Sequence, residues 1–137
     1  MVKLKWSGKC LDTNVIIKLE KEKLIFEKFL EEENNYFFPL VCQAELMTGY
    51  KGKDEKIRIK IWNEIKDGLN LKIINSNEKS INYYSELFWK LKNKGKKITQ
   101  NDLWILTLCF QNNLELITFD QKLEKHWREL VNNKRKE

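Results

Sequence analysis

Four acidic residues stand apart in this sequence because apolar side chains flank each of them. They are Asp12, Glu45, Asp102 and Asp120. Most of the other acidic residues lie in stretches rich in Lys and Glu. Carboxylates in apolar surroundings lose hydration and repel one another unless they share a cation. Oxygen ligands without His or Cys favour a hard cation. We therefore expect Mg²⁺ or Mn²⁺, which could activate a bound water and stabilise charge on a phosphate.

The spacing of the cysteines and of the single histidine does not fit thiol catalysis or a zinc site. Cys10, Cys42 and Cys109 lie far apart in apolar runs, which favours buried free thiols over disulfides. His126 has no second histidine to act with, so a structural zinc site lacks ligands.

The apolar pattern predicts strands that alternate with helices. We expect strands at residues 9–12, 36–41, 69–74 and 114–118. Helical spacing is found at 15–32, 42–50, 57–65, 81–91 and 99–112, and the segment 121–137 also reads as helical. Gly49, Gly68 and Gly95 are the expected ends of three of these helices, and Ser76 or Asn77 the expected cap of a fourth. This order favours a parallel sheet covered on both faces, in one domain spanning 1–137.

The four acids fall where such a sheet would hold a site. Asp12 ends the first expected strand and Asp120 lies two residues beyond the last. Asp102 is in the first turn of a helix, and Glu45 is near the start of the helix after the second strand. The functional crevice of an open parallel sheet lies beyond the carboxyl ends of its strands. Taken singly, an acid such as Asp102 is more often a helix-dipole partner. Together they predict one metal site.

The charge of the chain predicts a polyanionic partner. Its formal net charge is +6 and its pI is about 9.1, although a merely solvated Lys-rich surface has the same signature. Only three of the 26 basic residues are arginines, so bidentate reading of bases has few candidates. Lys94, Lys96 and Lys97 precede the helix that carries Asp102 and are candidates for phosphate contacts. Trp6 and Trp127 are the tryptophans considered for base stacking.

The location of the chain follows from what the sequence lacks. No stretch approaches the roughly 20 apolar residues that span a bilayer. Asp12 interrupts the N-terminal apolar run that a signal peptide would keep unbroken. We expect a cytoplasmic protein without a membrane partner.

Four segments resemble a known family, the PIN-domain ribonucleases, and within it the VapC-type toxins of toxin–antitoxin pairs. The matching segments are CLDTNVII at 10–17, QAELMTGY at 43–50, ITQNDLWILTLC at 98–109 and LELITFDQKL at 114–123. The first and last are the most specific. The resemblance implies a three-layer α/β/α fold with a central parallel sheet of four or five strands. The helical segment 121–137 departs from members that add a fifth strand, and LWILTLC stands where the family usually has alanines.

The resemblance also implies an activity and a site. Asp12, Glu45, Asp102 and Asp120 correspond to the family's metal ligands or water-positioning groups. Thr13 and Thr118 stand where hydroxyls lie beside that cluster, and Asn14 either caps the first helix or supports Asp12. The implied activity is cleavage of structured RNA, such as tRNA or ribosomal RNA, with Mg²⁺ or Mn²⁺. A cognate antitoxin and a homodimer are the implied protein partners.

Three other functions are compatible with parts of the sequence. A phosphatase with an aspartate nucleophile needs a second acid where this chain has Asn14. A receiver domain needs an acceptor aspartate after the third strand, where Ile74, Asn75 and Ser76 stand. The remaining alternative is a PIN-like binding or scaffold module without catalysis. The sequence leaves open the RNA target, the antitoxin and whether one or two ions bind.

Overall fold

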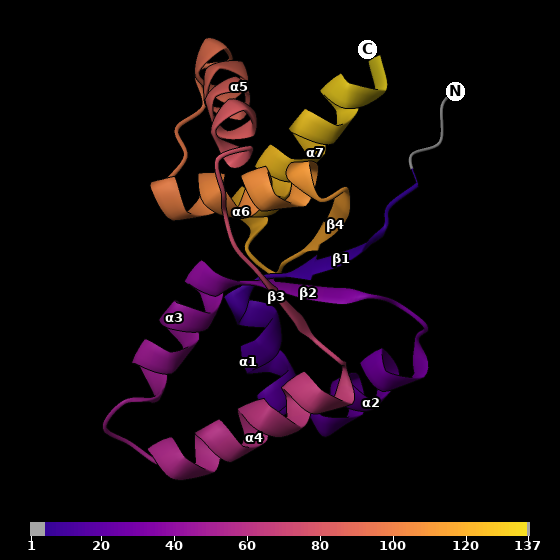
Figure 1. The fold of residues 1–137 in the computed structure, drawn as a ribbon, viewed down its shortest axis with the longest axis vertical. Helices are drawn as coiled ribbons and strands as arrows, with labels where there is room; N and C mark the ends of the chain where they lie inside the picture. The colour runs from indigo at the N-terminus through magenta and orange to yellow at the C-terminus, as the bar shows by residue number, and fades with distance from the viewer. Residues whose placement is uncertain (1–4, 137) are drawn as a thin grey trace.

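Four parallel strands form one sheet between two layers of helices (Figure 1). The computed structural model describes residues 5–136. The strands are β1 (Gly8–Leu11), β2 (Tyr36–Pro39), β3 (Lys72–Ile74) and β4 (Leu114–Ile117), in the order β3-β2-β1-β4. This confirms the three-layer α/β/α fold with a parallel sheet. In the part of the chain described, the sheet has four strands, and the C-terminal segment is a helix as expected.

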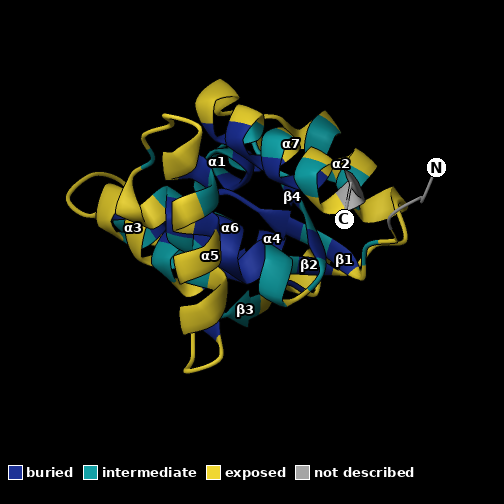
Figure 2. Ribbon diagram, turned by 90° about the horizontal axis from the view of Figure 1, so that it is seen from above, coloured by how far each residue is buried: buried dark blue, intermediate teal, exposed yellow. Residues whose placement is uncertain are grey.

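The helices divide between the two faces of the sheet. One face is covered by α1 (Thr13–Lys21), α2 (Lys23–Glu31), α3 (Leu40–Tyr50) and α4 (Glu55–Gly68). The other face is covered by α5 (Ser80–Asn93), α6 (Gln100–Gln111) and α7 (Gln121–Lys136). Buried residues follow the strands and the inner sides of the helices, while the outer sides are exposed (Figure 2). A sheet covered on both faces explains the nearly continuous apolar run of β1.

The path of the chain reverses beside β1. From β1 the chain moves outward to β2 and then to β3, with its helices on one face. It then crosses back through α5 and α6 to β4, which pairs with β1 on the other side. In register, Leu11 of β1 lies opposite Ile117 of β4. The two strands therefore end level with each other while their chains leave to opposite faces, which is where open α/β sheets place their ligand crevice.

Several predicted boundaries were wrong. The expected helix 15–32 is two helices, because Glu22 has an extended backbone (φ −124°, ψ 95°) between α1 and α2. Gly49 lies inside α3, which begins directly after Pro39. The third strand is shorter than expected because residues 69–71 still belong to the turn after α4. Helix α5 begins at Ser80, after a turn in which the Asn77 side chain accepts the Lys79 N–H.

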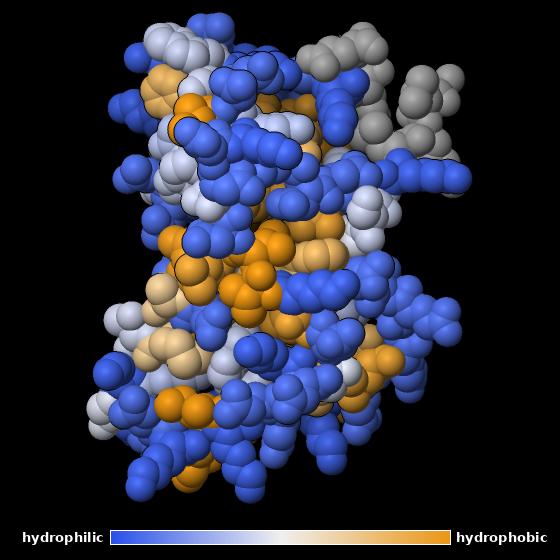
Figure 3. Space-filling view, in the orientation of Figure 1, coloured by the Kyte–Doolittle hydropathy of each residue, from blue (hydrophilic) through white to orange (hydrophobic). Residues whose placement is uncertain are grey.

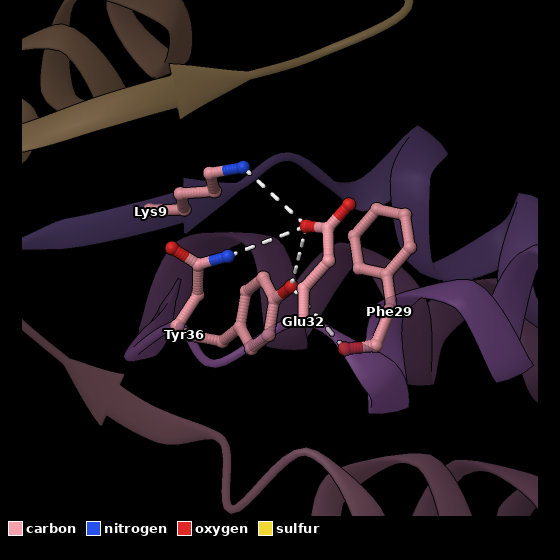
Figure 4. A network of polar contacts seen from close by, with 5 residues as sticks. Lys9, Phe29, Glu32 and Tyr36 are labelled. Atoms are coloured by element: carbon pink, nitrogen blue, oxygen red, sulfur yellow. Dashed lines mark hydrogen bonds and ion pairs between the residues drawn. The ribbon is translucent and has the colours of Figure 1, made fainter.

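A polar network joins the start of β1, the end of α2 and the start of β2, away from the crevice (Figure 4). Glu32 is its centre: the Lys9 Nζ lies 3.6 Å from its carboxylate and the Tyr36 hydroxyl 3.4 Å. The same hydroxyl is 3.4 Å from the carbonyl oxygen of Phe29. These contacts tie the residue that follows α2 to the starts of β1 and β2, and so fix where the first crossover returns to the sheet.

One face of the molecule is largely hydrophilic. Figure 3 shows charged and polar side chains over most of one face, with apolar side chains gathered across its middle, over the edge strand β3. None of the helices in the described range is long and apolar enough to cross a membrane.

Gly8 tests the close approach of β1 and β2. A Cβ on Gly8 would lie 2.6 Å from the Asn35 carbonyl oxygen and 2.8 Å from the Phe37 ring. We expect Gly8→Ala to lower the free energy of unfolding by about 1–3 kcal/mol, measured by urea denaturation. The matched control is Gly49→Ala, where a Cβ meets no described atom within 4 Å. It should be neutral or stabilise by up to about 1 kcal/mol. Equal effects of the two substitutions would contradict the packing described for Gly8.

Candidate functional site

An open cleft of about 640 Å³ lies at the carboxyl ends of β1 and β4, and all four predicted acids line it. Asp12 follows β1, Glu45 is in α3, Asp102 is in α6 and Asp120 precedes α7. The remaining wall consists of small polar side chains and two isoleucines: Thr13, Asn14, Ile17, Thr99, Gln100, Asn101 and Ile105. Four elements separated in sequence thus contribute a carboxylate each to one hollow. Among the described residues, no basic side chain lines it.

Asp12 is the most firmly held of the four acids. It is only 8% exposed and caps the N-terminus of α1, where its Oδ1 accepts the Thr13 N–H at 2.8 Å. Its Oδ2 accepts the Thr118 hydroxyl at 2.8 Å and the Asn14 amide at 3.4 Å. Donors on both oxygens of a buried carboxylate fix its orientation.

Cys42 adds a further contact to Asp12. Its Sγ lies 3.8 Å from the Asp12 Oδ1. Burial raises the pKa of the Cys42 thiol, so the S–H is kept and donates. The Cys42 carbonyl oxygen in turn accepts the Thr13 hydroxyl at 3.4 Å. All three cysteines are buried and free, as predicted.

The three residues predicted to support the acids lie beside them. Thr118 and Asn14 both contact Asp12, and the Asn14 amide also lies 3.3 Å from the Thr118 hydroxyl. Thr13 uses its backbone N–H for Asp12 and its hydroxyl for Cys42. Of the two possibilities left open for Asn14, the structure shows support of Asp12, because Asp12 itself is the cap of α1.

Asp120 caps the N-terminus of α7 with one of its carboxylate oxygens. Its Oδ1 accepts the N–H groups of Lys122 at 2.9 Å and Leu123 at 3.1 Å, which is an N-terminal cap. Its own N–H donates to the Thr118 hydroxyl at 3.0 Å. The side chain is therefore fixed in direction although it is exposed, and its second oxygen is left for the cleft.

Asp102 and Glu45 experience the charges of the other acids. Burial raises the pKa of Asp102, and the charges of Asp12 and Asp120 raise it further, while a hydrogen bond from Thr99 opposes the shift. Burial also raises the pKa of Glu45, with Asp12 and Asp102 adding to it. The cleft thus holds more negative charge than its own donors satisfy.

Three of the four acids have a structural reason to be there. Asp12 and Asp120 cap α1 and α7, and Asp102 is in the first turn of α6, whose cap is Thr99. Helix N-termini attract negative charge. Glu45 has no such reason, since it lies in the second turn of α3, away from the helix end. Glu45 adds a fourth carboxylate to a cleft in which the charges of Asp12 and Asp102 repel a further negative charge.

The donor set fits a hydrated hard cation better than a preformed cage. Within residues 5–136, no three Asp, Glu, His or Cys side chains converge closely enough to hold an ion directly. Like-charged carboxylates move apart when no cation lies between them. Mg²⁺ keeps several of its waters and is usually bound directly by only one or two carboxylates. A single ion in this cleft could therefore reach the remaining acids through water.

The basic and aromatic candidates lie elsewhere. Lys94 is 3.0 Å from the Asn133 side-chain oxygen and 3.5 Å from the Glu129 carboxylate, both on α7. Lys96 and Lys97 precede the cleft wall without lining it. Trp127 was wrongly considered for base stacking: it is buried, with its ring centroid 5.1 Å from that of Trp6.

The sequence did not single out five residues of the cleft wall: Ile17, Thr99, Gln100, Asn101 and Ile105. Four of them lie within three residues of Asp102, which was the available signal. Periodicity separates buried from exposed helix faces and does not show which residues at the start of α6 face the cleft. Phe119, exposed beside Asp120, was not predicted either, and it lies outside this wall.

Comparison with known proteins places the chain among PIN domains. The family model described as PIN domain matches residues 9–127. Ribonuclease VapC1 of Haemophilus influenzae is 32% identical over 120 residues, covering 82% of this chain and 86% of the relative. The solved structure of VapBC2 from Rickettsia felis bound to a promoter DNA fragment has a TM-score of 0.72 and 25% identity, and covers 85% of this chain and 91% of that one. VapBC-1 from nontypeable H. influenzae has a TM-score of 0.69 and 28% identity, and covers 88% and 92%.

Removing the charge of Glu45 should stabilise the metal-free protein. Because its pKa is raised in the folded chain, ionisation of Glu45 disfavours folding at neutral pH. We expect Glu45→Gln to raise the Tm by roughly 1–3 °C at pH 7 in EDTA, since solvent screens much of the effect. The gain should vanish below the ordinary carboxyl pKa of about 4.3, where the wild-type side chain is also neutral.

The matched control for this measurement is Glu55→Gln. Glu55 is in the first turn of α4, where a negative charge is favourable, and it lies outside the cleft. Its removal should leave the Tm unchanged or slightly lower. A lower Tm for Glu45→Gln in EDTA would show that the cleft does not repel this charge.

Proposed function

The chain belongs to the PIN-domain family, and from this premise we propose that it is a VapC-type endoribonuclease whose acidic cleft works with Mg²⁺ or Mn²⁺. The observation that carries the proposal is the meeting of Asp12, Glu45, Asp102 and Asp120 in one cleft, although they lie on four separate segments. The relative named a ribonuclease supports RNA as the substrate, and the net charge of +6 suits a polyanion. Structured RNA such as tRNA or ribosomal RNA is the proposed target class.

The four acidic residues would hold the cation and orient the water that attacks the phosphate. When bound, the cation supplies a water of lowered pKa and stabilises charge on the phosphate oxygens. Asp12 offers the best-fixed carboxylate, because donors on both of its oxygens hold it in place. Asp102 and Asp120 reach the same cleft from the starts of α6 and α7. Glu45, which has no capping duty, orients the attacking water.

The cleft also explains why RNA cleavage would require the cation. A phosphate approaching the four carboxylates meets negative charge, and no lysine or arginine of the described residues lines this hollow. The cation would therefore convert a repulsive surface into an attractive one. Loss of the ion should remove substrate binding in the cleft as well as chemistry.

The protein partners follow from the family relationship. The similar structures from R. felis and H. influenzae are VapBC complexes. We propose that this chain likewise binds a cognate antitoxin protein and forms a homodimer. Masking of the cleft by the antitoxin would silence the nuclease without a change in its fold.

A catalytically inactive scaffold is the second candidate, because favourable positions at helix N-termini account for three of the acids. Ser, Thr and Asn cap helices about as well as Asp, without mutual repulsion. A scaffold would therefore gain nothing from charged caps around one hollow or from a fourth acid at Glu45. The raised pKa of Asp102 and Glu45 favours the nuclease.

Substitution of Asp102 separates the two candidates. Asp102→Asn keeps the shape of the first turn of α6 and removes one charge from the cleft. We expect it to lower the rate of RNA cleavage in Mg²⁺ or Mn²⁺ at least about a hundredfold, the order of loss when a charge-stabilising group is removed. Its Tm in EDTA should not fall. The measurement is cleavage of end-labelled tRNA and ribosomal RNA, resolved on gels, with EDTA to remove the ion.

Glu124→Gln is the matched control for this assay. Glu124 is an acid in the first turn of α7 that pairs with Arg128 and does not line the cleft. Its substitution should leave cleavage within about twofold of wild type. Cleavage that survives both EDTA and Asp102→Asn would come from another source. A well-folded wild-type chain that cuts no RNA with either ion would be the scaffold.

A further inference from the structure

A second hollow of about 500 Å³ continues the acidic cleft and shares two of its wall residues, Asn14 and Ile17. It lies between α1 and the loop that joins β4 to α7. Its apolar surface comes from Ile17 and Phe119, and its rim carries Lys18, Lys21 and Glu22. The two hollows thus adjoin at Asn14 and Ile17, so that an acidic hollow lies beside a more apolar one whose wall includes two lysines.

Phe119 is presented to solvent by a rigid segment. Its side chain is 55% exposed, directly beside Asp120. Its N–H donates to the Asn14 side-chain oxygen at 3.1 Å. The residues on either side are also fixed, Thr118 by its hydroxyl bond to Asp12 and Asp120 by capping α7. The backbone of Phe119 is therefore fixed beside the acidic cleft, and its ring lines the second hollow. Exposed aromatic surface in a concave site is typical of ligand binding.

We propose that this second hollow is a nucleobase subsite, in which the base next to the scissile phosphate stacks on Phe119. The proposal rests on the proposed nuclease function. Stacking on an aromatic side chain is the commonest way in which proteins hold an unpaired base, and it tolerates any sequence. A hollow of this volume is of the size that holds small ligands. Because the hollow adjoins the acidic cleft, one base of a strand could bind in it while the neighbouring phosphate lies over the carboxylates.

Charge favours a nucleic-acid strand as the occupant. Lys18 and Lys21 extend from α1 on the rim, and a phosphate next to the stacked base would lie near them. Lys18 pairs with Glu22, but an ion pair between exposed side chains is weak and can be exchanged for a phosphate. The apolar surface suits a base, and the lysines beside it suit the phosphate of that nucleotide. The adjoining acidic cleft suits the scissile phosphate, bound through a cation.

Asn14 links the subsite to the carboxylate at the centre of the cleft. Its side-chain oxygen holds the Phe119 N–H, while its amide nitrogen lies 3.4 Å from Asp12 and 3.3 Å from the Thr118 hydroxyl. One amide therefore positions both the stacking ring and the surroundings of Asp12. A base bound in the subsite would therefore place the adjoining phosphate near the carboxylates, because the Asn14 side chain contacts both Phe119 and Asp12.

The test compares binding of strands with and without bases. The probes are a fluorescein-labelled single-stranded RNA of eight nucleotides and a strand of equal length whose riboses carry no bases. Binding is followed by fluorescence anisotropy with Ca²⁺ in place of Mg²⁺. We expect Phe119→Ala and Phe119→Leu to weaken the Kd for RNA about tenfold or more, and Phe119→Trp to retain it. None of them should alter the Kd for the abasic strand.

Trp89→Ala is the matched control, since Trp89 is equally exposed at 55% but lies on α5, outside both hollows. It should leave RNA binding unchanged. Wild-type affinity for RNA in Phe119→Leu would mean that the ring acts only as an apolar surface, as for a protein partner, and would overturn the subsite. So would wild-type affinity in Phe119→Ala.

The failure of the subsite and the failure of the nuclease can be told apart. If the wild type cleaves RNA with Mg²⁺ and Asp102→Asn does not, while Phe119→Ala binds RNA as wild type, only the subsite is wrong. If the wild type neither cleaves nor binds RNA, both proposals are wrong.

Discussion

Two neighbouring parallel strands, β1 and β4, end level with each other and send their chains to opposite faces of the sheet. This divergence brings the start of α1 and the start of α7 to one edge. The chain that returns through α6 adds a third helix N-terminus at the same edge, and α3 borders it from the other layer. Every functional side chain in the cleft depends on this arrangement, because none of the four acids is near another in sequence.

The electrostatics of that edge are only partly balanced by the protein. Three helix N-termini and the hydrogen bonds of Thr118, Asn14 and Thr13 compensate part of the negative charge. Burial raises the pKa of Asp102 and of Glu45, and the charges of the neighbouring carboxylates raise both further. In the proposed function a divalent cation would supply the missing positive charge, and a phosphate is a natural further ligand of such an ion. Proteins retain unbalanced charge of this kind mainly at functional sites.

The layered fold and the four acids could be predicted because each leaves a local signal. Strands of a doubly covered sheet are short apolar runs, and Asp12, Asp102 and Asp120 follow or begin such runs. The break at Glu22 could not be predicted, since both helices continue the same apolar spacing and only tertiary packing decides where the chain bends. The capping by Asp120 and the pairing of Lys94 with α7 depend on side-chain contacts that periodicity does not encode. The exposure of Phe119 could not be predicted, because it arises in the loop whose backbone is held by Asn14.

The central claim is that these carboxylates share a hard cation. Anomalous diffraction from crystals grown with Mn²⁺ measures this directly, because manganese scatters distinctly from the light atoms around it. The account predicts an anomalous peak in the cleft, bound to one or two of Asp12, Glu45, Asp102 and Asp120 and in contact with the others through water. An empty cleft at millimolar Mn²⁺, or a peak only at acids outside it, would contradict the account.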